Sequence, residues 1–122
     1  MDKTVPIDTL LEQTFSFAKA SRSLILDLPQ TPANQNDGRQ LITTSGALAA
    51  HYIEASEEPH PDKSALLMKT CIKDAKQSHL WLSLLDCGKD TNRQDLRNKL
   101  LEESEDIQLA LASLIQDKAS QT

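Results

Sequence analysis

Apolar residues recur at helical spacing in four segments of the chain, and this periodicity constrains the fold more than any other feature. In the first segment Leu11, Ala18 and Ile25 recur every seven residues, and parallel columns of apolar and small residues flank them. Such spacing gathers side chains on one side of an α-helix. The pattern predicts helices over residues 7–28, 38–58, 62–87 and 92–118. We therefore expect an all-α fold, an antiparallel up-down-up-down four-helix bundle that forms a single domain over residues 1–122.

Helix-breaking residues separate the four segments. Two prolines in the polar stretch LPQTPANQNDG are expected to end the first helix, because proline disrupts a helix interior. Pro59 and Pro61 divide the second helix from the third, and Gly88 is expected to stop the third. Thr91 and Gln94, three residues apart, predict a capping box at the start of the fourth helix.

The charge balance is acidic. The 122 residues include 18 acidic and 13 basic side chains, which gives a net charge of −5. This charge repels phosphate backbones and anionic lipid heads, and it argues against general nucleic-acid binding. A local basic patch remains open, and the candidate nucleic-acid band consists of Lys69, Lys73, Lys76, Arg93 and Arg97. No stacking aromatic residue or docking motif accompanies these side chains.

Two stretches carry a resemblance to a known family. QLITTSGALAAHYIEA and, after a short loop, IKDAKQSHLWLSLL resemble the four-helix-bundle proteins encoded in intervening sequences of bacterial 23S rRNA genes. That family includes the accessory variability determinant of diversity-generating retroelements. The matching positions are Ala49, Ala50, Tyr52, Glu54, Ala55, Lys73, Asp74, Ala75, Trp81, Leu82, Leu84 and Leu85. The resemblance implies a bacterial four-helix bundle, usually a homopentamer, with no known enzymatic activity. In the retroelement branch a basic surface binds reverse transcriptase and nucleic acid.

The second predicted helix gathers small residues at Ser45, Gly46, Ala47, Ala49 and Ala50. Glycine inside a helix costs about 1 kcal/mol relative to alanine, so we expect a neighbouring helix to approach closely here. Large residues of the third helix would fill the space, and leucine at position 49 or 50 would overpack it. The predicted helix-packing or oligomer interface comprises Ala49, Ala50, Tyr52, Glu54, Trp81, Leu82 and Leu85. Glu54 is expected to pair with Lys73 or with another subunit.

No arrangement of residues predicts catalysis, metal binding or a cofactor. His51, Glu54 and Glu58 lie one turn apart, but a di-iron bundle needs two Glu-x-x-His pairs and two further carboxylates. The one such pair, Glu57 and His60, is interrupted by a proline. The chain contains neither a phosphate-binding loop nor a dinucleotide fingerprint.

The two cysteines are expected to be free thiols. Cys71 and Cys87 lie on one predicted helix, and the helical rise places them about 24 Å apart, too far for a disulfide. Neither a signal peptide nor a membrane span is evident in the sequence, so we expect a cytoplasmic protein.

The sequence therefore predicts a non-enzymatic, self-assembling helical bundle that acts as an interaction module, with neither a membrane nor a small-molecule substrate as its partner. The alternative is an accessory protein that binds RNA or DNA, in association with a reverse transcriptase.

Overall fold

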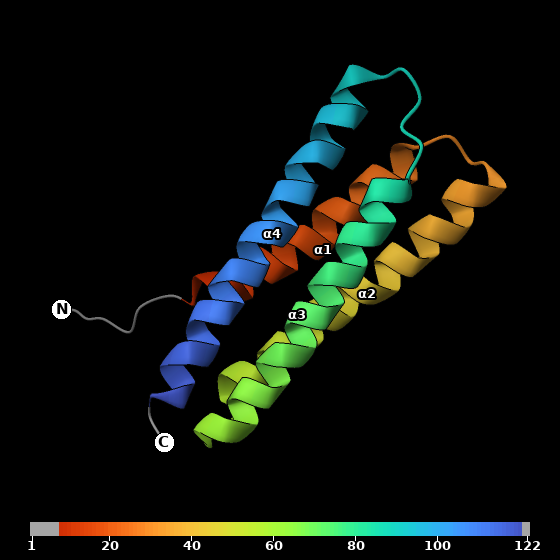
Figure 1. Ribbon diagram of the computed structural model, residues 1–122. Helices are drawn as coiled ribbons and strands as arrows, with labels where there is room; N and C mark the ends of the chain where they lie inside the picture. The colour runs from red at the N-terminus through yellow and green to blue at the C-terminus, as the bar shows by residue number, and fades with distance from the viewer. Residues whose placement is uncertain (1–7, 121–122) are drawn as a thin grey trace.

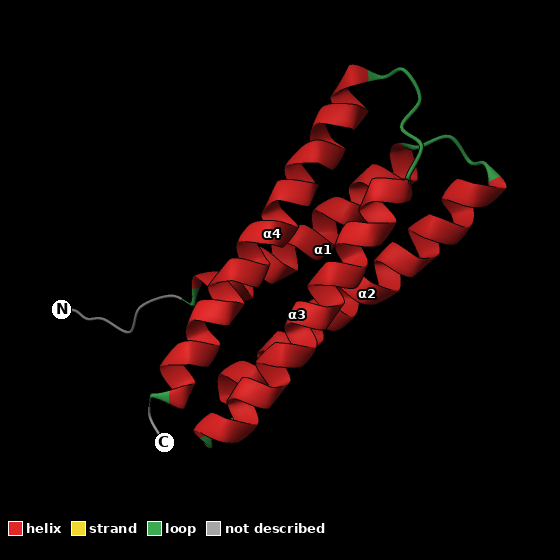
Figure 2. Cartoon of the chain, in the orientation of Figure 1, coloured by secondary structure: helices red, strands yellow, loops and turns green. Residues whose placement is uncertain are grey.

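The computed structural model describes residues 8–120, which form four helices (Figure 1). These are α1 (Thr9–Asp27), α2 (Pro32–Glu57), α3 (Pro61–Leu84) and α4 (Thr91–Ala119). Each helix packs against the next along the chain, and α4 also packs against α1, which closes the bundle. Over the described residues Figure 2 shows helices and loops but no strand. The predicted all-α four-helix bundle is confirmed. The expected helix start at residue 7 and the last two residues of the tail lie outside the described range.

The start of α2 differs from the prediction. The helix begins at Pro32, so most of the polar stretch expected to form a loop is its first two turns. Thr31 is the N-cap, and its hydroxyl accepts a hydrogen bond of 3.1 Å from the backbone N–H of Asn34. Proline fits the first helical position, where a backbone N–H would have no helical partner. Pro32 therefore starts a helix, so the prediction that it breaks one was wrong.

The connection between α3 and α4 also corrects the prediction. Helix α3 ends at Leu84, and Gly88 lies in the loop beyond it with φ 65°. Asp90 caps α4, because its carboxylate accepts a hydrogen bond of 3.1 Å from Arg93 N. The side chain of Gln94 donates to the carbonyl of Gly88 at 2.7 Å, so the expected capping box with Thr91 does not form.

The core is apolar and contains residues from all four helices. Burying one leucine or phenylalanine side chain stabilises a fold by roughly 1.5–3 kcal/mol. The largest fully buried apolar side chains are Phe17, Leu24, Leu41, Leu48, Leu82, Leu100, Ile107 and Leu111. On α1 the core column is Leu10, Phe17 and Leu24, whereas Leu11, the first member of the column named in the sequence, lies at the surface.

A row of polar contacts joins α2 to α3, and we call it the polar seam: Thr44, His51 and Ala55 on α2, and Ser78, Asp74 and Ser64 on α3. Ser78 Oγ donates to Thr44 Oγ1 at 2.9 Å, and Ser64 Oγ donates to the carbonyl of Ala55 at 2.8 Å. His51 Nδ1 and Asp74 Oδ2 are 2.6 Å apart. As the numbers rise along α2 they fall along α3, so the seam fixes the antiparallel register of this pair.

The two glycines of α2 face α1, whereas the sequence predicts that large residues of the third helix fill the space beside Gly46. A Cβ atom on Gly38 would lie 2.9 Å from Ile25 Cγ2, and one on Gly46 would lie 3.3 Å from a guanidinium nitrogen of Arg22. Arg22 also reaches across to the carbonyl of Ile42 at 3.5 Å. Ala50 is exposed, so leucine there would not overpack the protein, and that expectation was wrong.

Candidate functional site

The residues predicted to form one interface do not share one surface. Tyr52, Leu82 and Leu85 are buried inside the bundle and pack its helices together, whereas Ala50 and Glu54 are exposed. The remaining two, Ala49 and Trp81, are half-buried. The set therefore divides into core positions and separate surface positions.

Tyr52 ties α2 to the first turn of α1. Its hydroxyl donates to the carboxylate of Asp8, with distances of 3.0 and 3.2 Å to the two oxygens. The same carboxylate caps α1 by accepting from Leu10 N at 3.0 Å. Burial, followed by the bond to Asp8, raises the pKa of Tyr52 above its usual value of 10.0. The role of Tyr52 in this structure is to anchor a helix end.

The ion pair considered for Glu54 and Lys73 is absent from the described part of the chain. His51 and Asp74 connect α2 and α3 instead, and Asp74 is 8% exposed. Asp74 could have been found in the sequence as a carboxylate in the same helical column as the buried residues of α3.

Glu58 accepts hydrogen bonds from the backbone and ring of His60, and these bonds lower the pKa of Glu58.

The five residues of the candidate nucleic-acid band are not brought together. Lys69, Lys73 and Lys76 are exposed and line a hollow of about 420 Å³ on the outer side of α3. Arg93 turns toward α1, where its Nε donates to Asp27 at 3.1 Å, and this bond raises the pKa of Arg93. Arg97 donates to the backbone carbonyl of Leu85 at 3.0 Å. Only the three lysines form a continuous basic surface.

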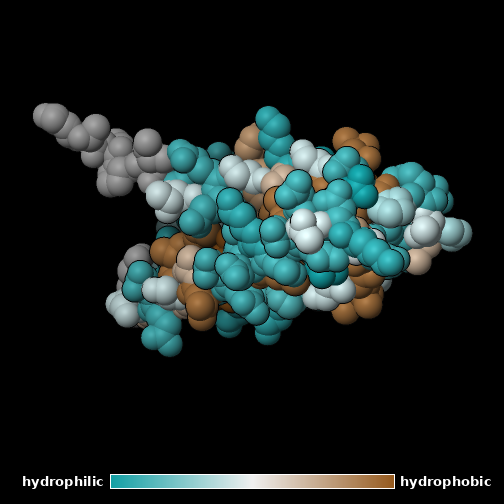
Figure 3. All heavy atoms as spheres, turned by 90° about the horizontal axis from the view of Figure 1, so that it is seen from above, coloured by the Kyte–Doolittle hydropathy of each residue, from teal (hydrophilic) through white to brown (hydrophobic). Residues whose placement is uncertain are grey.

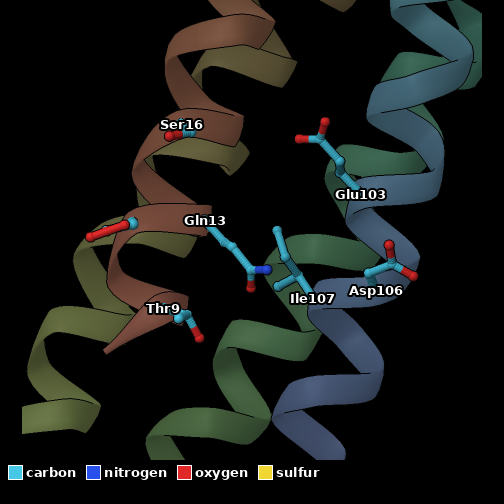
Figure 4. Close-up of a pocket in the computed structure, with 7 residues that line it drawn as sticks. Thr9, Gln13, Ser16, Glu103, Asp106 and Ile107 are labelled. Carbon is cyan, nitrogen blue, oxygen red and sulfur yellow. The ribbon is translucent and has the colours of Figure 1, made fainter. Parts of the chain in front are cut away.

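A second hollow, of about 410 Å³, lies between α1 and α4 (Figure 4). Gln13 from α1 and Ile107 from α4 point toward one another across it, and the carboxylate of Glu103 projects into it. Its lining is Thr9, Glu12, Gln13, Ser16, Glu103, Asp106 and Ile107. Three carboxylates, two hydroxyl groups and one amide make the lining mainly polar and acidic.

A third hollow, of about 430 Å³, lies between α1 and α2 and is mainly apolar. Leu11 and Phe15 contribute from α1, and Ala49 and Ile53 contribute from α2. The ammonium group of Lys19 lies 5.9 Å from the centre of the Phe15 ring, within the range of a cation–π contact. The half-buried position of Ala49 therefore belongs to an open surface hollow.

Both cysteines are free, as expected, and buried, but only Cys71 lies on α3; Cys87 lies in the loop after that helix, so the prediction that both share one helix was wrong. Burial raises the pKa of the Cys71 thiol to about 12, and it also raises the pKa of Cys87. The thiolate is the reactive form of cysteine, so both side chains are held in their unreactive state at neutral pH.

Neither a metal cluster nor a membrane helix is found between residues 8 and 120. Within that range no three histidine, cysteine, aspartate or glutamate residues are grouped so that they could hold a metal ion. None of the four helices described is long and apolar enough to cross a membrane. Comparisons with protein-family models, with curated proteins and with solved structures find no match to this chain.

Proposed function

We propose that this chain is a non-enzymatic helical bundle that associates with further copies of itself and serves as an interaction module in the cytoplasm. The resemblance to the bundles encoded in 23S rRNA intervening sequences supports membership of that bacterial family and a homopentameric assembly.

The observation that carries the proposal is the exposure of large apolar side chains on the outer surfaces of the helices. Phe15, Leu66, Leu109 and Leu26 are between 62 and 83% exposed. Further exposed apolar side chains are Leu11, Ile42, Ile53, Leu80 and Leu84. Figure 3 shows apolar atoms emerging at several places between polar areas of the surface. Leu11, Phe15 and Ile53 meet at the hollow between α1 and α2, where Glu12 and Glu57 lie beside them. A continuous apolar surface rimmed by polar residues is typical of protein–protein contacts.

Light scattering of the purified chain during size-exclusion chromatography tests the proposal. We expect a mass near five times the 13.5 kDa of one chain. A mass of one chain at every concentration that the protein tolerates would contradict self-assembly. A stable assembly of another size would retain the self-assembly and reject the pentamer.

A nucleic-acid-binding accessory role is a second candidate, and the lysine face of α3 favours it. Among the described residues Lys69, Lys73 and Lys76 form no ion pair, so their charges are available to phosphates. Binding of labelled RNA and DNA should then weaken steeply with salt, because each neutralised phosphate releases counterions. Absence of binding at low salt would exclude this role. Binding that survives Lys73→Gln and Lys76→Gln would place it on another surface.

A further inference from the structure

We infer that copies of this chain associate head to tail, with the outer side of α4 in one copy docked on the outer side of α3 in the next. The inference rests on the proposed self-assembly and adds the two surfaces that meet.

The receiving surface on α3 is a hollow with apolar parts between basic side chains, and we call it the basic face. It consists of Lys69, Ile72, Lys73, Lys76, Gln77 and Leu80. Leu80 is 50% exposed although it is a large apolar residue. Lys69 and Lys73 are four residues apart and Lys76 follows three residues later, a spacing at which like charges on a helix repel one another. The basic face therefore favours an acidic partner that also carries an apolar side chain.

The complementary surface lies on α4, and we call it the acidic ridge: Glu102, Glu105, Asp106 and Leu109. All four side chains are exposed, and Leu109 is 71% exposed. Glu102 and Asp106 are four residues apart, so they repel one another as the lysines do. A leucine beside three carboxylates on one side of a helix matches the charge and the apolar side chains of the basic face.

The two surfaces also lie at the same level along the bundle. Lys76 and His79 of α3 and Glu105 and Gln108 of α4 line one hollow inside the protomer. His79 Nε2 and Glu105 Oε2 are 3.5 Å apart there. This register places Leu109 within about one helical turn, or 5.4 Å, of Lys73 and Lys76 along the axis. A second copy related by rotation about an axis parallel to the helices keeps that level, so Leu109 and the lysines can meet.

The contact joins two different surfaces, so it is heterologous. Repetition of a heterologous contact gives a ring if the rotation closes and a filament if it does not. In a closed ring, the basic face and the acidic ridge of every copy are both covered by a neighbouring copy. The electrostatic part of the contact is exposed at its rim, so added salt should weaken the association.

Charge reversal on each surface, followed by the two reversals together, tests the inference. One variant carries Lys69→Glu, Lys73→Glu and Lys76→Glu, and the other carries Glu102→Lys, Glu105→Lys and Asp106→Lys. A third combines all six substitutions. The matched control, Arg39→Glu with Lys63→Glu and Lys89→Glu, changes the net charge as the first variant does but leaves both surfaces intact. Circular dichroism establishes that each variant is folded, and light scattering measures its mass.

We expect each single-surface variant to fall to the mass of one chain and the combined variant to regain the assembly. The control should keep the mass of the unaltered chain. If the unaltered chain assembles and both single-surface variants also assemble, the inference is wrong. The copies would then associate through another surface, such as the hollow between α1 and α2. If the unaltered chain is a monomer, the proposed function fails as well. Failure of the combined variant to reassemble, with both single-surface variants monomeric and folded, would also contradict the pairing.

Discussion

His51 Nδ1 on α2 lies 2.6 Å from Asp74 Oδ2 on α3, and this pair joins the two helices that share the most extensive contact in the described bundle. The Asp74 side chain is 11% exposed, whereas the His51 side chain is 35% exposed. A buried carboxylate is costly unless it is hydrogen-bonded, so the histidine compensates for the burial of Asp74.

Replacement of His51 tests this compensation. His51→Ala should lower the free energy of unfolding by about 1–3 kcal/mol, because it leaves a buried carboxylate without its ring partner. The double variant His51→Ala with Asp74→Ala should lose less free energy of unfolding than the two single variants lose together. Urea denaturation of the three variants measures these losses. His60→Ala, at an exposed histidine–carboxylate pair, is the control and should have little effect. Additive effects at His51 and Asp74 would contradict the coupling.

Asn34 makes three hydrogen bonds that attach the start of α2 to two loops. Its Nδ2 donates to the carbonyls of Pro29 and Asp86, and its Oδ1 accepts from Asp86 N, each at 2.9 Å. Asn34→Ala should therefore lower the free energy of unfolding by about 1–3 kcal/mol, since it leaves backbone groups unpaired. Asn36→Ala, at an exposed position on the same turn, provides the control. Equal melting temperatures for the two variants would refute this role.

The two glycines of α2 should respond in opposite directions to alanine. A Cβ on Gly38 would meet the branched side chain of Ile25 at 2.9 Å, so Gly38→Ala should destabilise the protein by about 1–3 kcal/mol. Gly46 faces the end of the long Arg22 side chain, which can move, so Gly46→Ala should stabilise by up to about 1 kcal/mol. Thermal unfolding measures both changes. Adding Ile25→Ala to Gly38→Ala should restore part of the lost stability, because it removes the side chain that the new Cβ would meet. If stability is not restored, contact with Ile25 is not the cause of the loss.

Two buried serines also differ. Ser78 donates to Thr44 across the polar seam, whereas the hydroxyl of Ser21 is buried without a hydrogen-bond partner among residues 8–120. Ser21→Ala should leave stability unchanged or raise it by up to about 1 kcal/mol, since it removes an unsatisfied polar group from the interior. Ser78→Ala should lower stability by about 1 kcal/mol. Chemical denaturation of the two variants side by side tests the contrast, and a loss at Ser21 would show that its hydroxyl is bonded in solution.

Stability should fall at alkaline pH. Burial raises the pKa of Cys71 from 9.0 to about 12, so the folded chain keeps a proton that the unfolded chain releases. The contribution is fully present below pH 9 and is lost as the pH rises from about 9 toward 12. Tyr52 acts in the same direction, because burial and Asp8 raise its pKa. The free energy of unfolding of Cys71→Ala should fall less steeply over this range than that of the unaltered chain. Identical slopes would contradict the assignment.

The helices were predictable from the sequence because their apolar period is regular, but their ends were not. Pro32 and Thr31 form a helix start, although a proline within a polar stretch also fits a loop. Asp90 outcompetes Thr91 as the cap of α4, and both residue types favour that position. The choice between such neighbours depends on where the tertiary packing places the first turn.

The candidate surfaces were harder to predict, because a helical pattern gives no direction to long side chains. The sequence predicts that Arg93 and the three lysines of α3 form one basic band, but Arg93 donates a hydrogen bond to Asp27 on α1. The exposure of Leu109 was equally hidden, since leucine is expected in a core.

The polar seam also limits how this chain can change length. Adding residues between two seam positions of α2 would shift every later hydroxyl, carbonyl and imidazole away from its counterpart on α3. An equal addition at the corresponding place in α3 would restore the alignment. The α2–α3 hairpin can therefore keep its seam only through paired, equal-sized changes in both arms.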